Sequence, residues 1–176
     1  MARLNYLRRV LRDADSATKL HAYRTLVRPI IEYAAVVWFP ELLTYVHKLE
    51  MVQRRAVRFI FSKYSYRDSP TLLLQRAELL PLHKRVKIQR LKILWQIIHN
   101  LTTTAPDKYI KFCEAGSSRT KHSRAIIQYF SKTNTLKHSF FPIVISEWNR
   151  LPDVIVSCDQ FQNFLSMLNS HILDNT

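Results

Sequence analysis

The chain has 176 residues, of which 47% are hydrophobic, and its net charge is +14. This hydrophobic content excludes wholesale disorder, and the length suits one domain or a small domain with an appendage. The single glycine, Gly116, excludes glycine-rich phosphate loops and favours helices joined by short loops over a sheet-rich fold.

The positive charge is concentrated in the first part of the chain. Residues 1–100 contain 19 lysines and arginines against 7 carboxylates, whereas residues 101–176 contain 8 against 6. Such a basic excess indicates a polyanionic partner, with RNA or DNA as the first candidate. An anionic membrane surface is the second, but there is no lipidation signal and no apolar run of about 18 residues. Without a signal peptide or a disulfide spacing, we expect an intracellular chain that does not span a membrane.

Before residue 42, the spacing of the apolar residues predicts two helices. The first covers 2–12, where leucines recur on one face and arginines surround them. The polar run 13–16 supplies N-cap chemistry for the second helix, which covers 17–38. We expect a kink in the second helix near Pro29, because proline removes a backbone donor and clashes with the preceding turn.

The next helix, expected over 42–61, has two unlike faces. Apolar residues fall on one broad face, while Lys48, Arg55 and Arg58 fall on the other, with Arg54 at its margin. Its last sixteen residues form a rod about 24 Å long. For one helix alone, a basic row is more simply the solvated face of a core helix. Further basic residues along the chain favour a row of arginines that meets a polyanion.

A long helix expected over 82–101 carries the second basic cluster: Lys84, Arg85, Lys87, Arg90 and Lys92. Aromatic residues lie among the two clusters. We expect Phe59 and Trp95 to pack in the core, whereas Tyr64 and Tyr66 lie in a polar loop. Basic side chains together with exposed rings are typical of surfaces that hold phosphate backbones and unpaired bases.

These elements predict a mainly α fold, a helical bundle with a small β-hairpin and C-terminal helices. We expect a basic helical domain at 1–101, a linker rich in Thr, Ser and Lys at 102–123, and a C-terminal extension at 124–176. In the extension, side chains alternate weakly in character along the sequence, and this suggests a hairpin between 124–130 and 135–140. Short helices are expected at 70–79, 142–150 and 158–172.

No catalytic constellation is apparent. The 13 carboxylates include no adjacent pair, whereas two-metal polymerases and nucleases need converging carboxylates. The histidines and cysteines lack zinc-site spacing, and the serines lack a nucleophile elbow. We therefore expect no enzymatic activity, no metal and no cofactor. The candidate nucleic-acid-binding residues are Arg54, Arg55, Arg58, Lys84, Arg85, Lys87 and Lys92.

Three stretches, spread over nearly the whole chain, carry a family resemblance. They are YRTLVRPIIEYA at 23–34 with Trp38, LEMVQRRAVRF at 49–59, and SFFP at 139–142 with WNRLP at 148–152. In this order and spacing they resemble the C-terminal part of reverse transcriptases from non-LTR retrotransposons of the LINE type, jockey-like ones in particular. Ile143 departs from the pattern, since relatives tend to carry arginine after Phe-Phe-Pro, and this weakens a phosphate contact there.

The resemblance implies a thumb followed by a helical extension. In that family the catalytic aspartates and the endonuclease lie upstream, and the thumb holds the template–primer duplex by its backbone. We therefore expect a non-catalytic fragment of a reverse transcriptase that binds RNA or DNA backbone through its basic helix, with the missing palm and fingers as a further partner. The reading frame is then a truncated remnant, and Met1 an accidental start.

Two alternatives stay open. In the first, exposed apolar surface that the palm domain once covered drives self-association or chaperone capture, and the chain is a helical protein–protein interaction module. The other alternative is a transposon remnant without a selected function. Sizing of the protein in solution separates the interaction module from a backbone-binding monomer.

Overall fold

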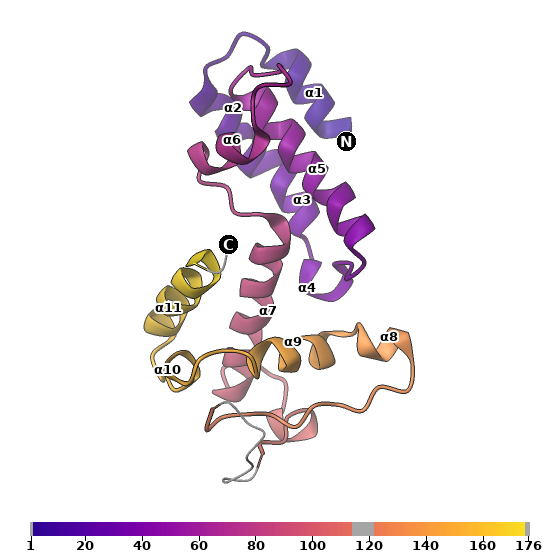
Figure 1. The fold of residues 1–176 in the computed structure, drawn as a ribbon, viewed down its shortest axis with the longest axis vertical. Helices are drawn as coiled ribbons and strands as arrows, with labels where there is room; N and C mark the ends of the chain where they lie inside the picture. The colour runs from indigo at the N-terminus through magenta and orange to yellow at the C-terminus, as the bar shows by residue number, and fades with distance from the viewer. Residues whose placement is uncertain (1, 114–121, 175–176) are drawn as a thin grey trace. The chain divides into compact units, whose positions relative to one another are not determined.

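The computed structural model describes residues 2–113 and 122–174, and Figure 1 shows them as a series of helices. The predicted mainly α class is confirmed. Within the described residues no strand forms, and one isolated antiparallel bridge joins Phe112 and Ile126. The chain divides into two compact units, residues 1–86 and 87–176. This division falls inside one long helix, earlier than the boundary after residue 101 that the sequence suggests.

The first unit combines one long helix with several short ones (Figure 1). The second of its helices begins as predicted, because the Asp15 carboxylate accepts hydrogen bonds from the N–H groups of Ala17 (3.1 Å) and Thr18 (3.4 Å). The elements are α1 (Ala2–Val10), α2 (Ser16–Ala22), the π-helix η1 (Tyr23–Val27), α3 (Arg28–Glu32), α4 (Ala35–Trp38), α5 (Leu43–Ile60) and α6 (Pro70–Arg76).

The single kinked helix expected over 17–38 is divided into pieces. Just before Pro29, η1 widens the helical turn, and the N–H of Arg28 bonds to the carbonyl of Tyr23. This distortion lies where the proline predicts one, since Pro29 cannot donate a hydrogen bond. The sequence predicts no second break, but α3 ends at Glu32, and Ala34 adopts a left-handed conformation with φ of 51°.

Helix α5 has the two faces that the sequence predicts. Its inner residues Ala56, Val57, Phe59 and Ile60 are at most 2% exposed and belong to one core cluster. Burial of a large apolar side chain contributes about 1.5–3 kcal/mol, so this face anchors the helix in the first unit. The cluster also contains Leu4, Leu7, Ala22, Tyr23, Val27, Leu73, Ala77 and Leu79.

Two polar residues of α5 fasten the start of α7 (Leu82–Ile98) within the first unit. Glu50 accepts a hydrogen bond from the N–H of His83 (3.1 Å), and the Nδ1 atom of that ring lies 2.9 Å from the same oxygen. The buried Gln53 side chain donates to the carbonyl of Leu80 (2.8 Å). Glu50 thus satisfies a donor that the helix start leaves open.

The second unit is built around the fully buried Trp148. Its ring centroid lies 6.1 Å from that of Phe164, and Trp95, at 5.6 Å from Phe164, extends the same aromatic group. The expected burial of Trp95 is confirmed. Besides the rest of α7, the elements are the 3-10 helix η2 (Pro106–Lys108), α8 (Asn134–Lys137), α9 (Phe140–Trp148), α10 (Asp153–Val156) and α11 (Phe161–Asp174).

The predicted hairpin between 124–130 and 135–140 is wrong. Residues 134–137 form α8, capped by the Thr133 hydroxyl, which accepts from the N–H of Leu136 (3.2 Å). The segment 124–130 pairs elsewhere: the N–H of Cys113 bonds to Ala125 O (2.8 Å), and the N–H of Ile127 bonds to Lys111 O (2.8 Å). Part of the expected linker therefore packs in the second unit, while residues 114–121 lie outside the described residues.

The WNRLP stretch holds this segment in place. The Asn149 amide accepts from the N–H of Ile126 (2.9 Å) and donates to its carbonyl (2.7 Å), much as a neighbouring strand would. Trp148 Nε1 donates to the carbonyl of Arg124 (3.0 Å). The motif residues Trp148 and Asn149 thus stabilise the fold of the second unit.

Candidate nucleic-acid interface

The outer face of α5 presents Arg54 and Arg55. Arg55 is exposed and Arg54 is half-buried. Neither side chain makes an ion pair or a hydrogen bond with any part of the chain that the structure describes. Because the opposite face of the helix is packed in the core, these guanidinium groups stand on a fixed backbone, and no carboxylate of the described chain pairs with them.

Arg58, one turn further along α5, is used differently. Its terminal nitrogens donate to the carbonyls of Tyr64 and Asp68, each at 3.4 Å. Arg58 therefore holds the loop after α5 while its charge stays unneutralised, since carbonyl groups carry no net charge. The Asp68 carboxylate accepts from the N–H of Ser65 (3.0 Å), which fixes the same loop from within.

The loop after α5 exposes the two tyrosines, as expected, with Tyr64 54% and Tyr66 84% exposed. Their surroundings differ. The Arg67 guanidinium lies 5.5 Å above the Tyr66 ring, and its Nε donates to the Tyr66 hydroxyl (3.0 Å). Tyr64 instead faces α1, where the guanidinium of Arg8 lies 5.8 Å from its ring centroid.

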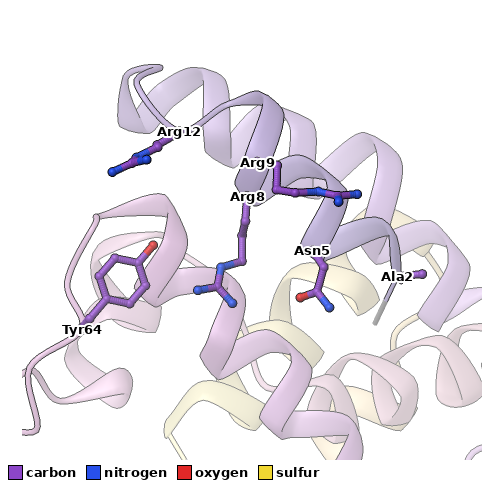
Figure 2. A pocket seen from close by; sticks show the side chains of 6 residues that line it. All are labelled: Ala2, Asn5, Arg8, Arg9, Arg12 and Tyr64. Carbon is purple, nitrogen blue, oxygen red and sulfur yellow. The ribbon is translucent and has the colours of Figure 1, made fainter.

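Tyr64 forms one wall of a groove of about 930 Å³ along α1. The other lining residues are Ala2, Asn5, Arg8, Arg9 and Arg12. Figure 2 shows the Arg8 and Arg12 side chains on the side of α1 where Tyr64 lies, whereas Arg9 extends the other way. The groove thus combines a partly exposed aromatic ring with guanidinium groups.

Sequence reasoning missed this groove, although a signal was present. Positions 5, 8, 9 and 12 are spaced as i, i+3, i+4 and i+7, which places them on one side of a helix. On the sequence alone, these arginines only surround the leucine face of the first helix. That Tyr64 lies beside them depends on the loop after α5, which local sequence does not reveal.

On α7, Arg85 is paired with a carboxylate. Its Nη2 donates to Glu32 Oε2 at 3.0 Å, and its Nε donates to Oε1. Arg28 approaches the same carboxylate at 3.8 Å. Burial, reinforced by the nearby positive charge of Arg85, lowers the pKa of Arg28. Arg85 therefore stabilises the first unit, and its guanidinium is not an open phosphate contact.

The other cations of α7 do not form one open row either. Arg90 is buried, with its Nη1 atom 3.7 Å from Glu147, and Lys92 Nζ lies 5.3 Å from the centre of the Phe161 ring. Lys84 and Lys87 are half-buried. Of the seven predicted residues, Arg54 and Arg55 thus have the geometry closest to the expected one.

The fold and this surface define a mainly α-helical chain whose first unit presents uncompensated arginines. Comparisons with known proteins found no matching family model, no matching curated protein and no matching solved structure. No helix among the described residues is long and apolar enough to cross a membrane. Within residues 2–113 and 122–174, no group of three or more His, Cys, Asp or Glu side chains could hold a metal ion.

Proposed function

We propose that the first unit binds the phosphate backbone of RNA or DNA without catalysing a reaction on it. The observation that carries this proposal is the outward position of Arg54 and Arg55 on a regular 18-residue helix, without a carboxylate partner in the described chain. Residues 1–86 contain 16 lysines and arginines against 7 carboxylates, a net charge of +9. A field of this sign attracts polyanions and orients them toward the helix.

Arginine suits this task because its planar guanidinium donates two parallel hydrogen bonds to a phosphate. Arg54 and Arg55 are neighbours on a helix whose other side is buried, so the backbone that carries them is already ordered before a phosphate binds. Contacts to phosphate carry no sequence information, so the binding is indifferent to base sequence. Arg58 adds its positive charge one turn away.

The resemblance of residues 49–59 to the thumb of non-LTR reverse transcriptases supports this function. In the structure this stretch belongs to α5, where Glu50 and Gln53 fasten the chain inward while Arg54 and Arg55 point outward. We infer that the chain derives from such a thumb and retains its grip on a template–primer duplex. No chemical step is assigned to it.

Fluorescence anisotropy with a labelled RNA–DNA hybrid, measured over a range of salt concentrations, tests this proposal. Contact with about four phosphates gives a log–log salt slope of about −3.6. The double variant Arg54→Glu/Arg55→Glu should bind at least tenfold more weakly and show a shallower slope. Lys132→Glu/Lys137→Glu, at two exposed positions of the second unit, is the matched control for charge. Affinity independent of salt, or equal losses in both double variants, would overturn the proposal.

A second candidate function, self-association, is favoured by exposed apolar side chains in the first unit. Tyr33 is 80% exposed and Leu43 is 83% exposed, and others lie close to them in sequence: Leu26, Ile30, Val37, Trp38, Leu42 and Tyr45. Exposed apolar surface of this kind often marks an interface. Light scattering over a range of protein concentrations decides: a dimer supports this function, and a monomer throughout excludes it.

A further inference from the structure

We propose that the groove between α1 and Tyr64 binds an unpaired nucleotide of single-stranded RNA or DNA. The phosphate would lie on Arg8 and Arg12, and the base would stack on the Tyr64 ring. This inference rests on the proposed nucleic-acid binding of the first unit and adds to it a ligand class and a site separate from Arg54 and Arg55.

The electrostatics of the groove suit a phosphate. Arg8, Arg9 and Arg12 line it together with Asn5, and none of its lining residues is acidic. None of the three arginines forms an ion pair with a carboxylate in the described residues. The guanidinium groups of Arg8 and Arg12 therefore lie on the Tyr64 side of a cavity that is large enough for a nucleotide, and Arg9, which extends the other way, adds its charge nearby.

The aromatic wall of the groove suits an unpaired base. Tyr64 is 54% exposed, and the Arg8 guanidinium lies 5.8 Å from its ring centroid. A base that enters the groove meets a phenol ring and a guanidinium plane, both of which stack on bases. A base inside a duplex is already stacked and paired, so only an unpaired base gains from this wall.

The backbone that carries the ring is held in position by the protein. Arg58 donates to the carbonyl of Tyr64 itself and to that of Asp68, and Asp68 accepts from the N–H of Ser65. These contacts tie both ends of the loop to α5 before any ligand arrives. A pre-positioned ring loses less entropy on binding than a mobile one.

The neighbouring tyrosine provides an internal contrast. Tyr66 is more exposed than Tyr64, but its ring lies against Arg67 and its hydroxyl accepts from that side chain. It does not line the groove. Exposure alone would favour Tyr66 as the stacking residue, whereas the arrangement around the groove favours Tyr64.

The experiment compares Tyr64→Ala with Tyr66→Ala in the full chain. Each variant is titrated against labelled single-stranded oligonucleotides, in DNA and RNA versions, and against a duplex of equal length. Tyr64→Ala should weaken single-strand binding about 5- to 100-fold, which is the usual effect of losing the stacking of one base on an aromatic side chain. Because stacking tolerates any base, the loss should not depend on the oligonucleotide sequence. Duplex binding should change less than twofold, and Tyr66→Ala should leave both affinities unchanged. Tyr64→Phe should retain single-strand binding.

Arg8→Ala, with Arg3→Ala as its control, tests the phosphate side. Both arginines lie on α1, but only Arg8 lines this groove. Arg8→Ala should lower single-strand affinity more than Arg3→Ala does. It should also make the log–log salt slope shallower by the amount that one phosphate contact contributes. Circular dichroism confirms that each variant is folded.

The outcomes separate this inference from the proposed function. If duplex binding depends on Arg54 and Arg55 while single-strand binding ignores Tyr64, the groove inference fails alone. Equal losses of single-strand and duplex binding in Tyr64→Ala also overturn it. If single-strand binding depends on Tyr64 but no duplex binds, nucleotide binding by the groove is supported and duplex binding by Arg54 and Arg55 is excluded. If neither nucleic acid binds, both fail.

Discussion

Arg90 and Arg124 of the second unit are used in the opposite way to Arg54 and Arg55 of the first. In the second unit, Arg90 is buried beside Glu147, and Arg124 bonds both to Asp159 (2.7 Å) and to the carbonyl of Val156 (3.3 Å). In the first unit, Arg54 and Arg55 have no carboxylate partner among the described residues. Some cations are used internally there as well: Lys19, which donates to the Ser62 hydroxyl, and Arg85.

This difference shows why net charge alone does not locate a binding surface. A buried arginine paired with a carboxylate contributes to folding and presents little field to solvent. An exposed arginine on a packed helix contributes almost nothing to folding and keeps its field.

Replacement of Arg90 should destabilise the second unit strongly. Removal of one partner of a buried ion pair costs about 3–5 kcal/mol, and this is the upper limit here because the Glu147 side chain is 18% exposed. Arg90→Ala should therefore lower the free energy of unfolding by up to that amount, measured by urea denaturation with the buried Trp95 and Trp148 as fluorescent reporters. Arg55→Ala should change it by less than about 0.5 kcal/mol. Equal effects of the two variants would break the comparison.

Asn149 should be the next most sensitive position. Asn149→Ala removes both hydrogen bonds to Ile126, whose buried N–H and carbonyl then lack their partner. Two lost hydrogen bonds together with an unsatisfied buried group cost about 2–3 kcal/mol. Hydrogen exchange should show faster exchange of the Ile126 amide than in the parent chain. Asn163→Ala, at an exposed position of α11, is the matched control and should leave that amide protected.

Much of the helical framework could be predicted from local sequence. The apolar period of α5, the N-cap at Asp15 and the distortion next to Pro29 each depend on residues within a few positions of one another. These constraints, such as the period of the apolar side chains and the missing proline donor, involve only neighbouring residues, so they do not depend on tertiary contacts.

The fate of each basic residue could not be predicted in this way. Arg85 meets Glu32 across 53 positions, and Arg124 meets Asp159 across 35. The bridge between Phe112 and Ile126 and the position of Tyr64 beside Arg8 are likewise non-local. One helical period predicts which side chains share a face, but the partners of that face depend on tertiary packing.

Arg58 combines the two roles of arginine in this protein, because it holds a loop by hydrogen bonds and still carries a charge that no carboxylate of the described chain compensates. Arg58→Ala should remove the hydrogen bonds to Tyr64 and Asp68 at a cost of about 1 kcal/mol, since both bonds are long and partly solvated. Amides of residues 64–68 should exchange faster with solvent. If stability and exchange both match those of Arg55→Ala, Arg58 does not hold the loop.

The smallest effect concerns the carboxylates of the second unit. Hydrogen bonds from the Ser123 backbone and hydroxyl lower the pKa of Asp153, and the Arg124 side chain lowers that of Asp159. A lowered folded-state pKa stabilises the fold above the ordinary aspartate value, and this contribution is lost as the pH falls through the folded pKa. Acidification below the ordinary aspartate value of about pH 4 should therefore progressively remove this contribution, and Asp153 and Asp159 should keep their contacts to a lower pH than carboxylates with ordinary pKa values would.

Carboxyl-carbon NMR titration measures both groups. Arg124→Ala should move the pKa of Asp159 up toward the ordinary value and leave that of Asp153 where it is, because Ser123 holds Asp153. A rise of both values would mean that the two carboxylates respond to one shared field and not to separate partners. An unchanged Asp159 would mean that Arg124 is not paired in solution, and Arg124 would then be uncompensated, as Arg54 and Arg55 of the first unit are.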